Sequence, residues 1–145
     1  MRIKKVVVIG SGTMGSGIAA HLCNANIPVT LLDLKTEISE QARDKIHKSK
    51  PPLLLDKSKI NNIKVGNILD NFAEVKEADW VVEAVVERID IKHDIYEKIF
   101  KERKKGAIVS SNTSSIPIKV LSQNLSEEEK KDFCITHFFN PVRYM

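Results

Sequence analysis

Short apolar runs alternate along this chain with longer stretches in which apolar residues return at helical spacing. Residues 5–9 contain the continuous β-branched run Val-Val-Val-Ile, which is expected of a strand buried on both faces. In residues 13–26, Met14, Ile18 and Leu22 recur at helical spacing. We therefore predict a strand that leads directly into a helix.

The same alternation continues along the rest of the chain. A second helix is predicted over residues 36–50, before Pro51, and a third begins at Asp90, a candidate N-cap, and ends at Gly106. Strands that alternate with helices predict an α/β fold, here a doubly wound, mainly parallel sheet. The further strands are expected at residues 28–33, 63–66, 80–85, 107–110 and 133–138, and a helical stretch around 118–123 and an acidic one at 127–129 separate the last two.

A glycine-rich hexapeptide, Gly10-Ser11-Gly12-Thr13-Met14-Gly15, stands where the first strand passes into the first helix. Gly10 permits the tight turn, Gly12 lets the backbone approach a pyrophosphate, and Gly15 lets the helix lie close to the sheet. We interpret Gly10, Gly12, Thr13, Met14 and Gly15 as the cofactor-binding loop of a Rossmann-type domain. The spacing by itself is a weak signal, because a fold-level pattern does not establish binding.

Asp33 strengthens this interpretation because it ends the predicted second strand, about 20 residues after the glycines. A carboxylate there can accept hydrogen bonds from the hydroxyls of the adenosine ribose, and its charge would repel a 2′-phosphate. We therefore predict NAD rather than NADP as the cofactor, although Lys35 nearby is a cation that would suit a phosphate. The alternative is a glycine-rich turn with a strand-terminal Asp that binds no ligand.

Two polar stretches follow the predicted fifth and sixth strands. They are Ser110-Ser111-Asn112-Thr113-Ser114-Ser115 and Thr136-His137-Phe138-Phe139-Asn140-Pro141. Taken singly, a run of Ser, Asn and Thr is usually a turn, and a histidine beside aromatic residues is usually structural. Because the carboxyl ends of parallel strands meet at one edge of the sheet, the two stretches together indicate polar groups that converge on a small substrate.

Composition and charge narrow the class of protein. A chain of 145 residues with 42% hydrophobic content has room for one globular domain, and its net charge of +4 comes from dispersed lysines and arginines, so nucleic-acid binding is disfavoured. We expect no membrane span and no cleavable signal. Cys23 and Cys134 match no metal-ligand spacing and are read as reduced core thiols, which favours a cytoplasmic location. No metal site is predicted.

Together these motifs resemble those of the 3-hydroxyacyl-CoA dehydrogenases. The matching stretches, in the family's order and across nearly the whole chain, are VVVIGSGTMGSGIAAHL, LLD, ADWVVEAVVERIDIK, SSNTSS and THFFNPVRYM. SNTSS followed by HFFNP is far more restrictive than a glycine fingerprint. Residues 51–55 and HFFNPVRYM are most similar to bacterial multidomain members, in which the dehydrogenase is joined to an enoyl-CoA hydratase-like region.

The resemblance implies a set of cofactor-binding residues. Asp33 corresponds to the family's ligand for the adenosine ribose, which agrees with the prediction from its position. Glu87 and Lys92 match residues that contact the nicotinamide half of NAD, and Asn140 matches a polar neighbour in the nicotinamide pocket.

The resemblance also implies catalytic and substrate-binding residues. His137 matches the catalytic histidine, Ser114 matches a residue that touches both substrate and cofactor, and Asn112 is a further candidate for orienting the substrate. Lys45 and Lys48 lie in a region where family members offer basic side chains to the CoA phosphates, although helical spacing alone favours a solvated face. The implied reaction is the oxidation of 3-hydroxyacyl-CoA to 3-ketoacyl-CoA in fatty-acid β-oxidation, with His137 as general acid and base.

In the family, a glutamate soon after HFFNP hydrogen-bonds the histidine, and a helical domain then completes the acyl pocket and the dimer interface. The sequence reaches Met145 before either, so we expect residues 1–145 to bind NAD but to turn over poorly, and the full-length protein to be a homo-oligomer. Two other functions stay open. One is a β-hydroxyacid dehydrogenase that acts on free acids, and the other is a non-catalytic dinucleotide-binding module.

Overall fold

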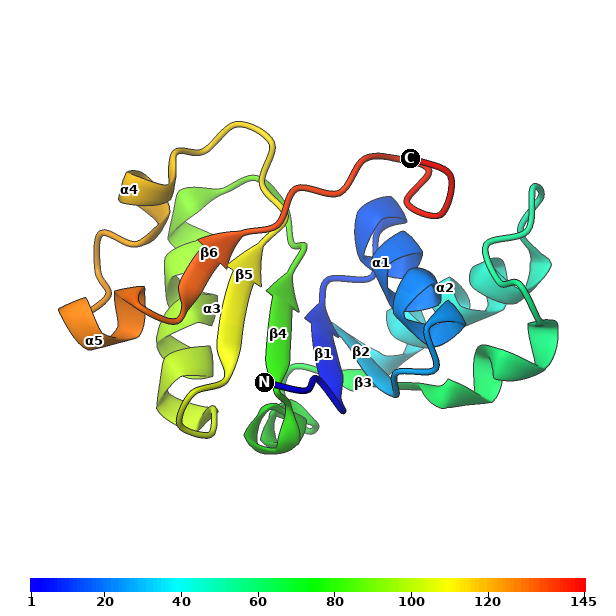
Figure 1. Ribbon diagram of the computed structural model, residues 1–145, viewed down its shortest axis with the longest axis horizontal. Helices are drawn as coiled ribbons and strands as arrows, with labels where there is room; N and C mark the ends of the chain where they lie inside the picture. Colours follow the sequence, from blue (N-terminus) through cyan, green and yellow to red (C-terminus); the bar gives the residue numbers. More distant parts are fainter.

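A parallel sheet of six strands organises the chain in the computed structural model, which describes all 145 residues (Figure 1). The strand order is β3-β2-β1-β4-β5-β6, and every neighbouring pair is parallel. The chain therefore runs outward from β1 in one direction and from β4 in the other, which confirms the doubly wound prediction. The strands are β1 Val6–Ile9, β2 Val29–Asp33, β3 Ile63–Asn67, β4 Trp80–Glu83, β5 Ile108–Ser111 and β6 Phe133–Ile135.

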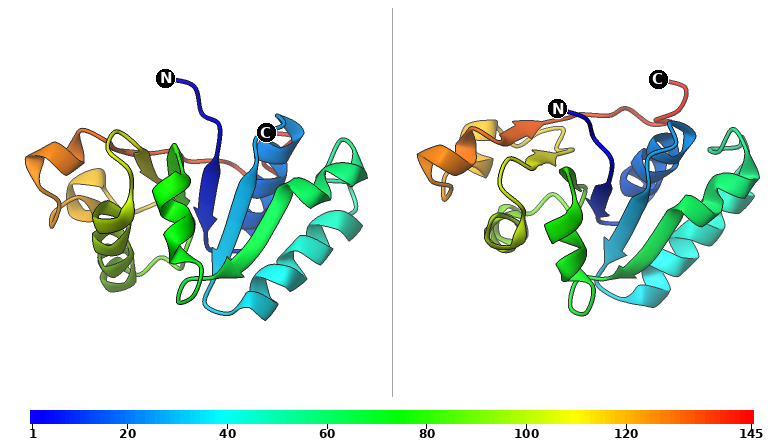
Figure 2. Two further views of the ribbon diagram at one scale, coloured as in Figure 1. Left: turned by 90° about the horizontal axis from the view of Figure 1, so that it is seen from below. Right: turned by 60° about the horizontal axis from the view of Figure 1, so that its bottom comes forward.

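Helices cover the two faces of the sheet in separate halves (Figure 2). On one face, α1 (Thr13–Asn24) and α2 (Thr36–Lys48) lie against the β1–β3 half. On the other face, α3 (Ile89–Glu102) lies against the β4–β6 half. The shorter helices are the 3₁₀ helices η1 Lys57–Asn62 and η2 Phe72–Glu77, and the α-helical turns α4 Ile118–Leu121 and α5 Glu127–Lys130.

The first strand divides its side chains between two hydrophobic cores. Val6 and Val8 join the core beneath α1 and α2, whereas Val7 and Ile9 join the core beneath α3. All four side chains are fully buried, which explains why the strand is apolar at every position rather than at alternate ones. Burial of side chains of this size contributes roughly 1.5–3 kcal/mol each.

All six strands were predicted from the sequence, with ends within one residue except for β4 and β6, which were predicted to end two and three residues too late. β4 ends at Glu83 rather than at 85, because the Glu83 side chain accepts a hydrogen bond from the backbone N–H of Val85 at 2.9 Å and turns the chain away from the ladder. β6 ends at Ile135 rather than at 138. The Thr136 backbone N–H still donates to the Ser111 carbonyl, but the N–H of Phe138, two residues further on, donates to a side chain.

The ends of α3 also differ from the prediction. Arg88 is the N-cap and Asp90 lies in the first turn, where its carboxylate accepts a hydrogen bond from Arg88 and interacts favourably with the helix dipole. The helix ends at Glu102, before Gly106, whose φ of +82° shapes the turn into β5 instead. The short helix η2 was not predicted, because six residues carry too little periodicity to detect.

The two cysteines differ in burial. Cys23 lies in the core beneath α1, where burial raises the pKa of its thiol to about 11. Cys134 on β6 is only half-buried, so its assignment to the core was right only in part. Both are free thiols.

After β6, the chain crosses above the carboxyl ends of the strands and returns to α1 (Figure 1, red). Val142 packs directly over Gly17 of α1, where a Cβ atom would lie 3.0 Å from a Val142 methyl carbon. Arg143 Nη1 and Tyr144 Oη both donate to the Pro52 carbonyl, at 2.6 and 3.0 Å. The C-terminal segment 136–145 therefore connects the β4–β6 half of the domain to the α1–α2 half.

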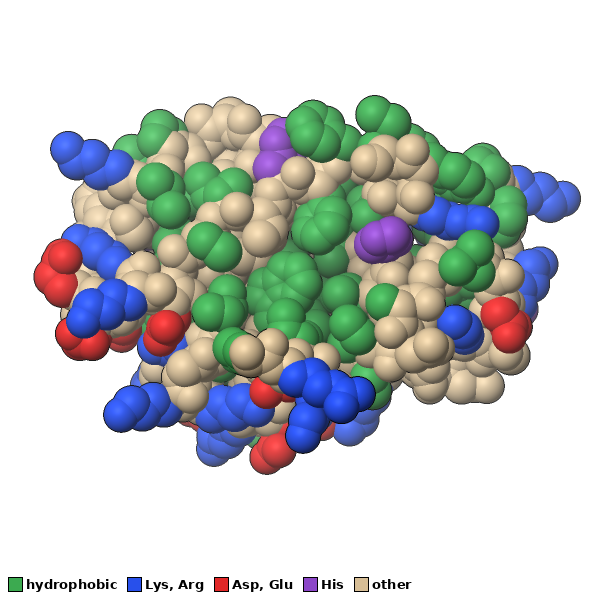
Figure 3. Space-filling view, in the orientation of Figure 1, with side chains coloured by type: hydrophobic (Ala, Val, Ile, Leu, Met, Phe, Trp, Pro, Cys, Tyr) green, Lys and Arg blue, Asp and Glu red, His purple; other side chains and the backbone are tan.

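The surface in Figure 3 shows hydrophobic side chains gathered across the middle of the molecule, with charged side chains around them. The basic groups on this face are interspersed with acidic ones. None of the helices combines the length and the apolar character that crossing a bilayer requires.

Candidate cofactor and substrate site

The glycine-rich loop joins β1 to α1 under close steric constraint. Gly10 has a φ of +100°, and a Cβ atom there would collide with the backbone carbonyl of Ala84. A Cβ atom on Gly15 would overlap the carbonyl oxygen of Gly10. At Gly12, by contrast, a Cβ atom would meet nothing within 4 Å. Gly10 and Gly15 are thus required by the fold, whereas Gly12 leaves open space at the N-terminus of α1, where a pyrophosphate can be held.

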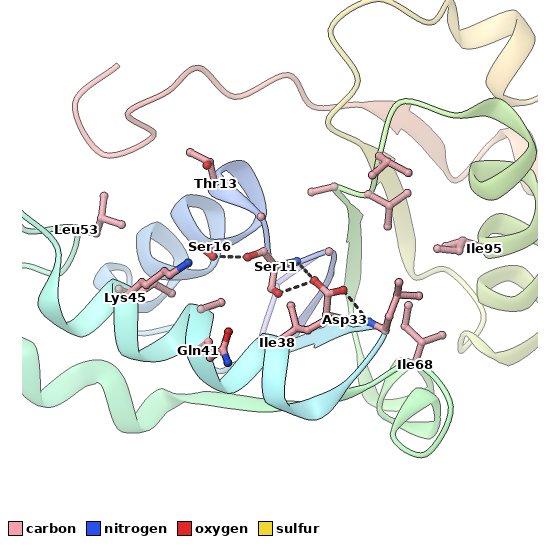
Figure 4. A pocket seen from close by; sticks show the side chains of 18 of the residues that line it. Ser11, Thr13, Ser16, Asp33, Ile38, Gln41, Lys45, Leu53, Ile68 and Ile95 are labelled. Atoms are coloured by element: carbon pink, nitrogen blue, oxygen red, sulfur yellow. Dashed lines mark hydrogen bonds between the residues drawn. The ribbon is translucent and has the colours of Figure 1, made fainter.

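The Asp33 carboxylate is fixed beside this loop (Figure 4). Its Oδ2 accepts hydrogen bonds from the backbone N–H and the hydroxyl of Ser11, at 2.8 and 2.5 Å. Its Oδ1 accepts one from the backbone N–H of Leu34 at 2.7 Å. The carboxylate is therefore oriented before any ligand binds, at the end of β2 where a ribose-binding acid is expected.

A cavity of about 690 Å³ opens beside the loop and Asp33, a size typical of small-molecule and cofactor sites. Its walls come from the glycine-rich loop, α2, the end of β2 and the connection between β4 and α3 (Figure 4). Among the sequence-predicted residues, Gly10, Gly12, Thr13, Asp33 and Lys45 line it. Outside its lining lie Met14, packed against the core beneath α1; Gly15, buried in α1; and Lys48, exposed on α2.

A buried ion-pair network adjoins the cavity on the β4 side. Lys92 is 1% exposed and donates from Nζ to Glu83 Oε1 at 2.7 Å and to Glu87 Oε1 at 2.8 Å. Glu83 is fully buried, and its Oε2 accepts hydrogen bonds from Tyr96 and Ser111, each at 2.6 Å. The same contacts raise the pKa of Tyr96, because burial and the Glu83 charge both disfavour a phenolate.

Glu87 extends this network to the loop after β5. Its Oε2 accepts hydrogen bonds from the hydroxyls of Thr113 at 2.7 Å and Ser115 at 3.1 Å. Partial burial raises the pKa of Glu87, but the hydrogen bonds from Lys92 and Thr113 outweigh it, so that the pKa lies below its ordinary value. Glu87 and Lys92 were predicted from the sequence as site residues, but Glu83 was not. The sequence feature that could have identified Glu83 is its position as a carboxylate at the end of a strand that is otherwise apolar and buried on both faces.

The two polar stretches that follow β5 and β6 do meet at the carboxyl edge of the sheet. The side-chain oxygen of Asn112 accepts a hydrogen bond from the backbone N–H of Phe138. Ser114, His137 and Asn140 are exposed at this edge and lie outside the lining of the cavity. The His137 ring lies against Phe139, with 4.6 Å between ring centroids. The candidate site thus consists of the cavity on the α2 side and, at the sheet edge beyond β4, the exposed polar side chains of Ser114, His137 and Asn140.

The comparison with protein families matches residues 5–145 to the 3-hydroxyacyl-CoA dehydrogenase, NAD binding domain. A relative in Rickettsia felis, provisionally named a fatty acid oxidation complex trifunctional enzyme, is 46% identical over 99% of this chain and 21% of its own length. A probable 3-hydroxyacyl-CoA dehydrogenase of Deinococcus radiodurans is 42% identical over the whole chain and 44% of its own length. The chain thus spans less than half of either relative.

The solved structures place the fold in the same group. The crystal structure of 3-hydroxybutyryl-CoA dehydrogenase from Escherichia coli superposes on the whole of this chain with a TM-score of 0.87 and 27% sequence identity, and 31% of that protein is covered. The strands and helices that surround the cavity are therefore arranged as in a dehydrogenase of known structure.

Proposed function

Because the chain belongs to the family of 3-hydroxyacyl-CoA dehydrogenase NAD-binding domains, we propose that it holds NAD for the oxidation of 3-hydroxyacyl-CoA to 3-ketoacyl-CoA in fatty-acid β-oxidation. The observation that carries this proposal is the Asn112–Phe138 hydrogen bond. It holds the segment with His137 at the same sheet edge as the glycine-rich loop, so a proton-transferring group and a dinucleotide can meet there.

The residues present suit NAD. The open space at Gly12 and the N-terminus of α1 would receive the pyrophosphate, and Asp33 would accept hydrogen bonds from the adenosine ribose and disfavour a 2′-phosphate. Glu87, Lys92 and Asn140 would lie toward the nicotinamide half. When bound, the nicotinamide supplies the acceptor for the substrate hydride.

The proton of the substrate hydroxyl would pass to His137. An exposed imidazole can take a proton in the oxidation and return it in the reduction. Ser114 would hydrogen-bond the reacting oxygen or the thioester carbonyl. Asn112 would orient the substrate through its side-chain NH₂ group, while its carbonyl oxygen accepts from Phe138 and holds the His137 segment.

An acyl-CoA thioester is the substrate class we propose. Lys45 lines the cavity on α2, and Lys48 follows three residues later on the same helix. Either ammonium group could therefore meet a CoA phosphate. We also propose that the whole protein works in the cytoplasm as a homo-oligomer. These statements concern the whole protein, whereas this chain covers 44% of its Deinococcus radiodurans relative.

The experiment that tests the proposal follows NADH absorbance with acetoacetyl-CoA and, separately, with free acetoacetate. It uses the 145-residue chain and a chimera in which the carboxyl-terminal region of the Deinococcus radiodurans relative follows Met145. NADH oxidation with the thioester alone is the expected result for the chimera. Oxidation with the free acid would favour a β-hydroxyacid dehydrogenase, and NADH binding without turnover on either compound would favour a non-catalytic module.

A further inference from the structure

Glu83 is a buried carboxylate that is surrounded only by donors. Oε1 accepts from Lys92 Nζ and from the Val85 backbone N–H, and Oε2 accepts from the Tyr96 and Ser111 hydroxyls. The Lys92 ammonium and the Val85 N–H can only donate, so Oε1 meets both as an unprotonated oxygen. Charge-assisted hydrogen bonds of 2.6–2.9 Å are those of an ionised carboxylate, so Glu83 carries a negative charge.

Lys92 is the single cation between two carboxylates. Its ammonium contacts both Glu83 and Glu87, so the trio of Glu83, Lys92 and Glu87 sums to one net negative charge. The nearest further cation along the chain, Arg88, is paired with Asp90 at 2.7 Å and leaves this sum unchanged. One carboxylate would balance the lysine, so the second leaves an excess negative charge on the trio, of which Glu83 and Lys92 are buried and Glu87 is 43% exposed.

The excess charge lies immediately behind the wall of the cavity. Ala84, Val85 and Val86, which connect Glu83 to Glu87, are all lining residues. In a doubly wound sheet the two halves each take one nucleotide, and Asp33 and the α1 N-terminus serve the adenosine and the pyrophosphate. The second nucleotide therefore belongs to the β4–β6 half, which contains the trio. Glu83 and Lys92 are shielded from solvent, so salt screens their charges little.

We propose that the trio of Glu83, Lys92 and Glu87 biases the site toward the oxidised form of the cofactor, with Glu83 as the buried residue that sets its net charge. The nicotinamide ring is positively charged in NAD⁺ and neutral in NADH, so a negative trio attracts the first and not the second. The inference rests on the proposed cofactor but not on the hydroxyacyl-CoA reaction. It makes Glu83 a specificity-determining residue that touches neither substrate nor cofactor.

The test compares the dissociation constants of NAD⁺ and NADH for the 145-residue chain and its Glu83→Gln variant. NADH is titrated by its fluorescence, and NAD⁺ by competition with it. Glutamine keeps the shape of the side chain but makes the trio neutral. The ratio of the NAD⁺ constant to the NADH constant should rise about fivefold or more, the size expected for one poorly screened charge within about 10 Å. An equal loss for both forms would reduce Glu83 to a structural residue and overturn the proposal.

Two control variants separate charge from packing. Glu97→Gln removes the same charge from an exposed position further along α3, and Tyr96→Phe removes one donor to Glu83 without changing any charge. Both should leave the ratio at its original value. A rise with Tyr96→Phe as large as with Glu83→Gln would mean that lost hydrogen bonding is the cause, and would contradict the proposal.

If Glu83→Gln does not fold, Glu87→Gln carries the same charge change at a side chain that is 43% exposed, and the ratio must rise there. Failure of this inference is distinguishable from failure of the proposed function. An original chain that binds neither NAD⁺ nor NADH overturns both. A chain that binds both forms, with an unchanged ratio in the folded variants, overturns the charge bias alone.

Discussion

The side-chain oxygen of Asn112 and the backbone N–H of Phe138 form a hydrogen bond of 2.8 Å between residues 26 positions apart in the chain. It forms just beyond the point where β6 stops pairing with β5. The Asn112 side chain therefore accepts from a backbone N–H that lies beyond the hydrogen bonds of the sheet. The contact fixes the course of the backbone immediately after His137. Together with the hydrogen bond from the Thr136 backbone N–H to the Ser111 carbonyl, it joins the two polar stretches.

Asn112→Ala should loosen this segment. Loss of a net hydrogen-bond contribution of about 0.5–1.5 kcal/mol should speed amide exchange at Phe138 severalfold, which NMR would measure. The affinity for NAD⁺ should change less than about twofold, because Asn112 lies outside the cavity lining. Asn112→Asp keeps an acceptor oxygen and serves as the matched control. Unchanged exchange at Phe138 in the alanine variant would show that the contact does not hold the segment.

His137→Gln should separate binding from chemistry. In the active chimera, removal of a general acid and base should lower kcat by about 10²–10⁴. The dissociation constant of NAD⁺ should stay within about twofold, since His137 does not line the cavity. Steady-state kinetics and a binding titration on the same preparation measure both. Retention of the original kcat would remove His137 from its proposed role.

Asp33→Asn should shift the choice of cofactor. The amide loses the charge that repels a 2′-phosphate, while its oxygen can still accept from the backbone N–H of Ser11. The ratio of NADP to NAD affinity should rise about tenfold or more, which corresponds to about 1.4 kcal/mol. Parallel titrations with the two dinucleotides measure this ratio. If it does not rise, the account of Asp33 given above is wrong.

Two glycines of the loop should respond in opposite ways to alanine. Gly15→Ala places a Cβ atom on the carbonyl of Gly10 and should lower the free energy of unfolding by about 2 kcal/mol or more. Gly12→Ala meets no neighbour and should change that free energy by less than about 0.5 kcal/mol. It should nevertheless weaken NAD⁺ binding about tenfold or more, because the methyl group occupies the approach to the backbone. Urea unfolding and NAD⁺ titration distinguish the two, and a Gly12→Ala variant with unaltered affinity would place the pyrophosphate elsewhere.

Acid stability should depend on Glu74. Hydrogen bonds from the ammonium groups of Lys5 and Lys64 lower the pKa of Glu74 from 4.5 to about 2 in the folded chain. Because the folded pKa is the depressed one, the stabilisation is complete above pH 4.5 and is lost as the pH falls toward 2. Glu74→Gln should therefore lower stability at neutral pH and flatten its decline over this interval, as measured by urea unfolding at several pH values. An equally steep decline in the variant would assign the acid sensitivity to other carboxylates.

Much of the fold could be predicted because its signals are local. The run Val6–Ile9 is apolar at every position and is followed by a glycine-rich turn, so both the strand and its burial on two faces could be read directly. The same holds for α1, with its spaced apolar residues. Strand ends were harder to predict. β4 ends where the Glu83 side chain accepts a hydrogen bond from the Val85 backbone N–H, and no proline or glycine marks that position.

Only part of the site could be predicted in the same way. The roles proposed for Asp33 and Gly12 follow from their positions along the chain, and both residues line the cavity. Glu83 was missed because its partners come from β5 and α3, so its significance depends on tertiary contacts that no spacing encodes. The hydrogen bond between Asn112 and Phe138 could not be predicted for a similar reason, since it appears only once β5 and β6 lie side by side.

The packing of Val142 on Gly17 joins α1 to the C-terminal segment 136–145. The helix whose N-terminus would receive the pyrophosphate therefore also anchors the far end of the segment that contains His137. A methyl group added at position 17 would lie 3.0 Å from a Val142 methyl carbon, so Gly17→Ala should displace this segment while leaving the cavity lining in place.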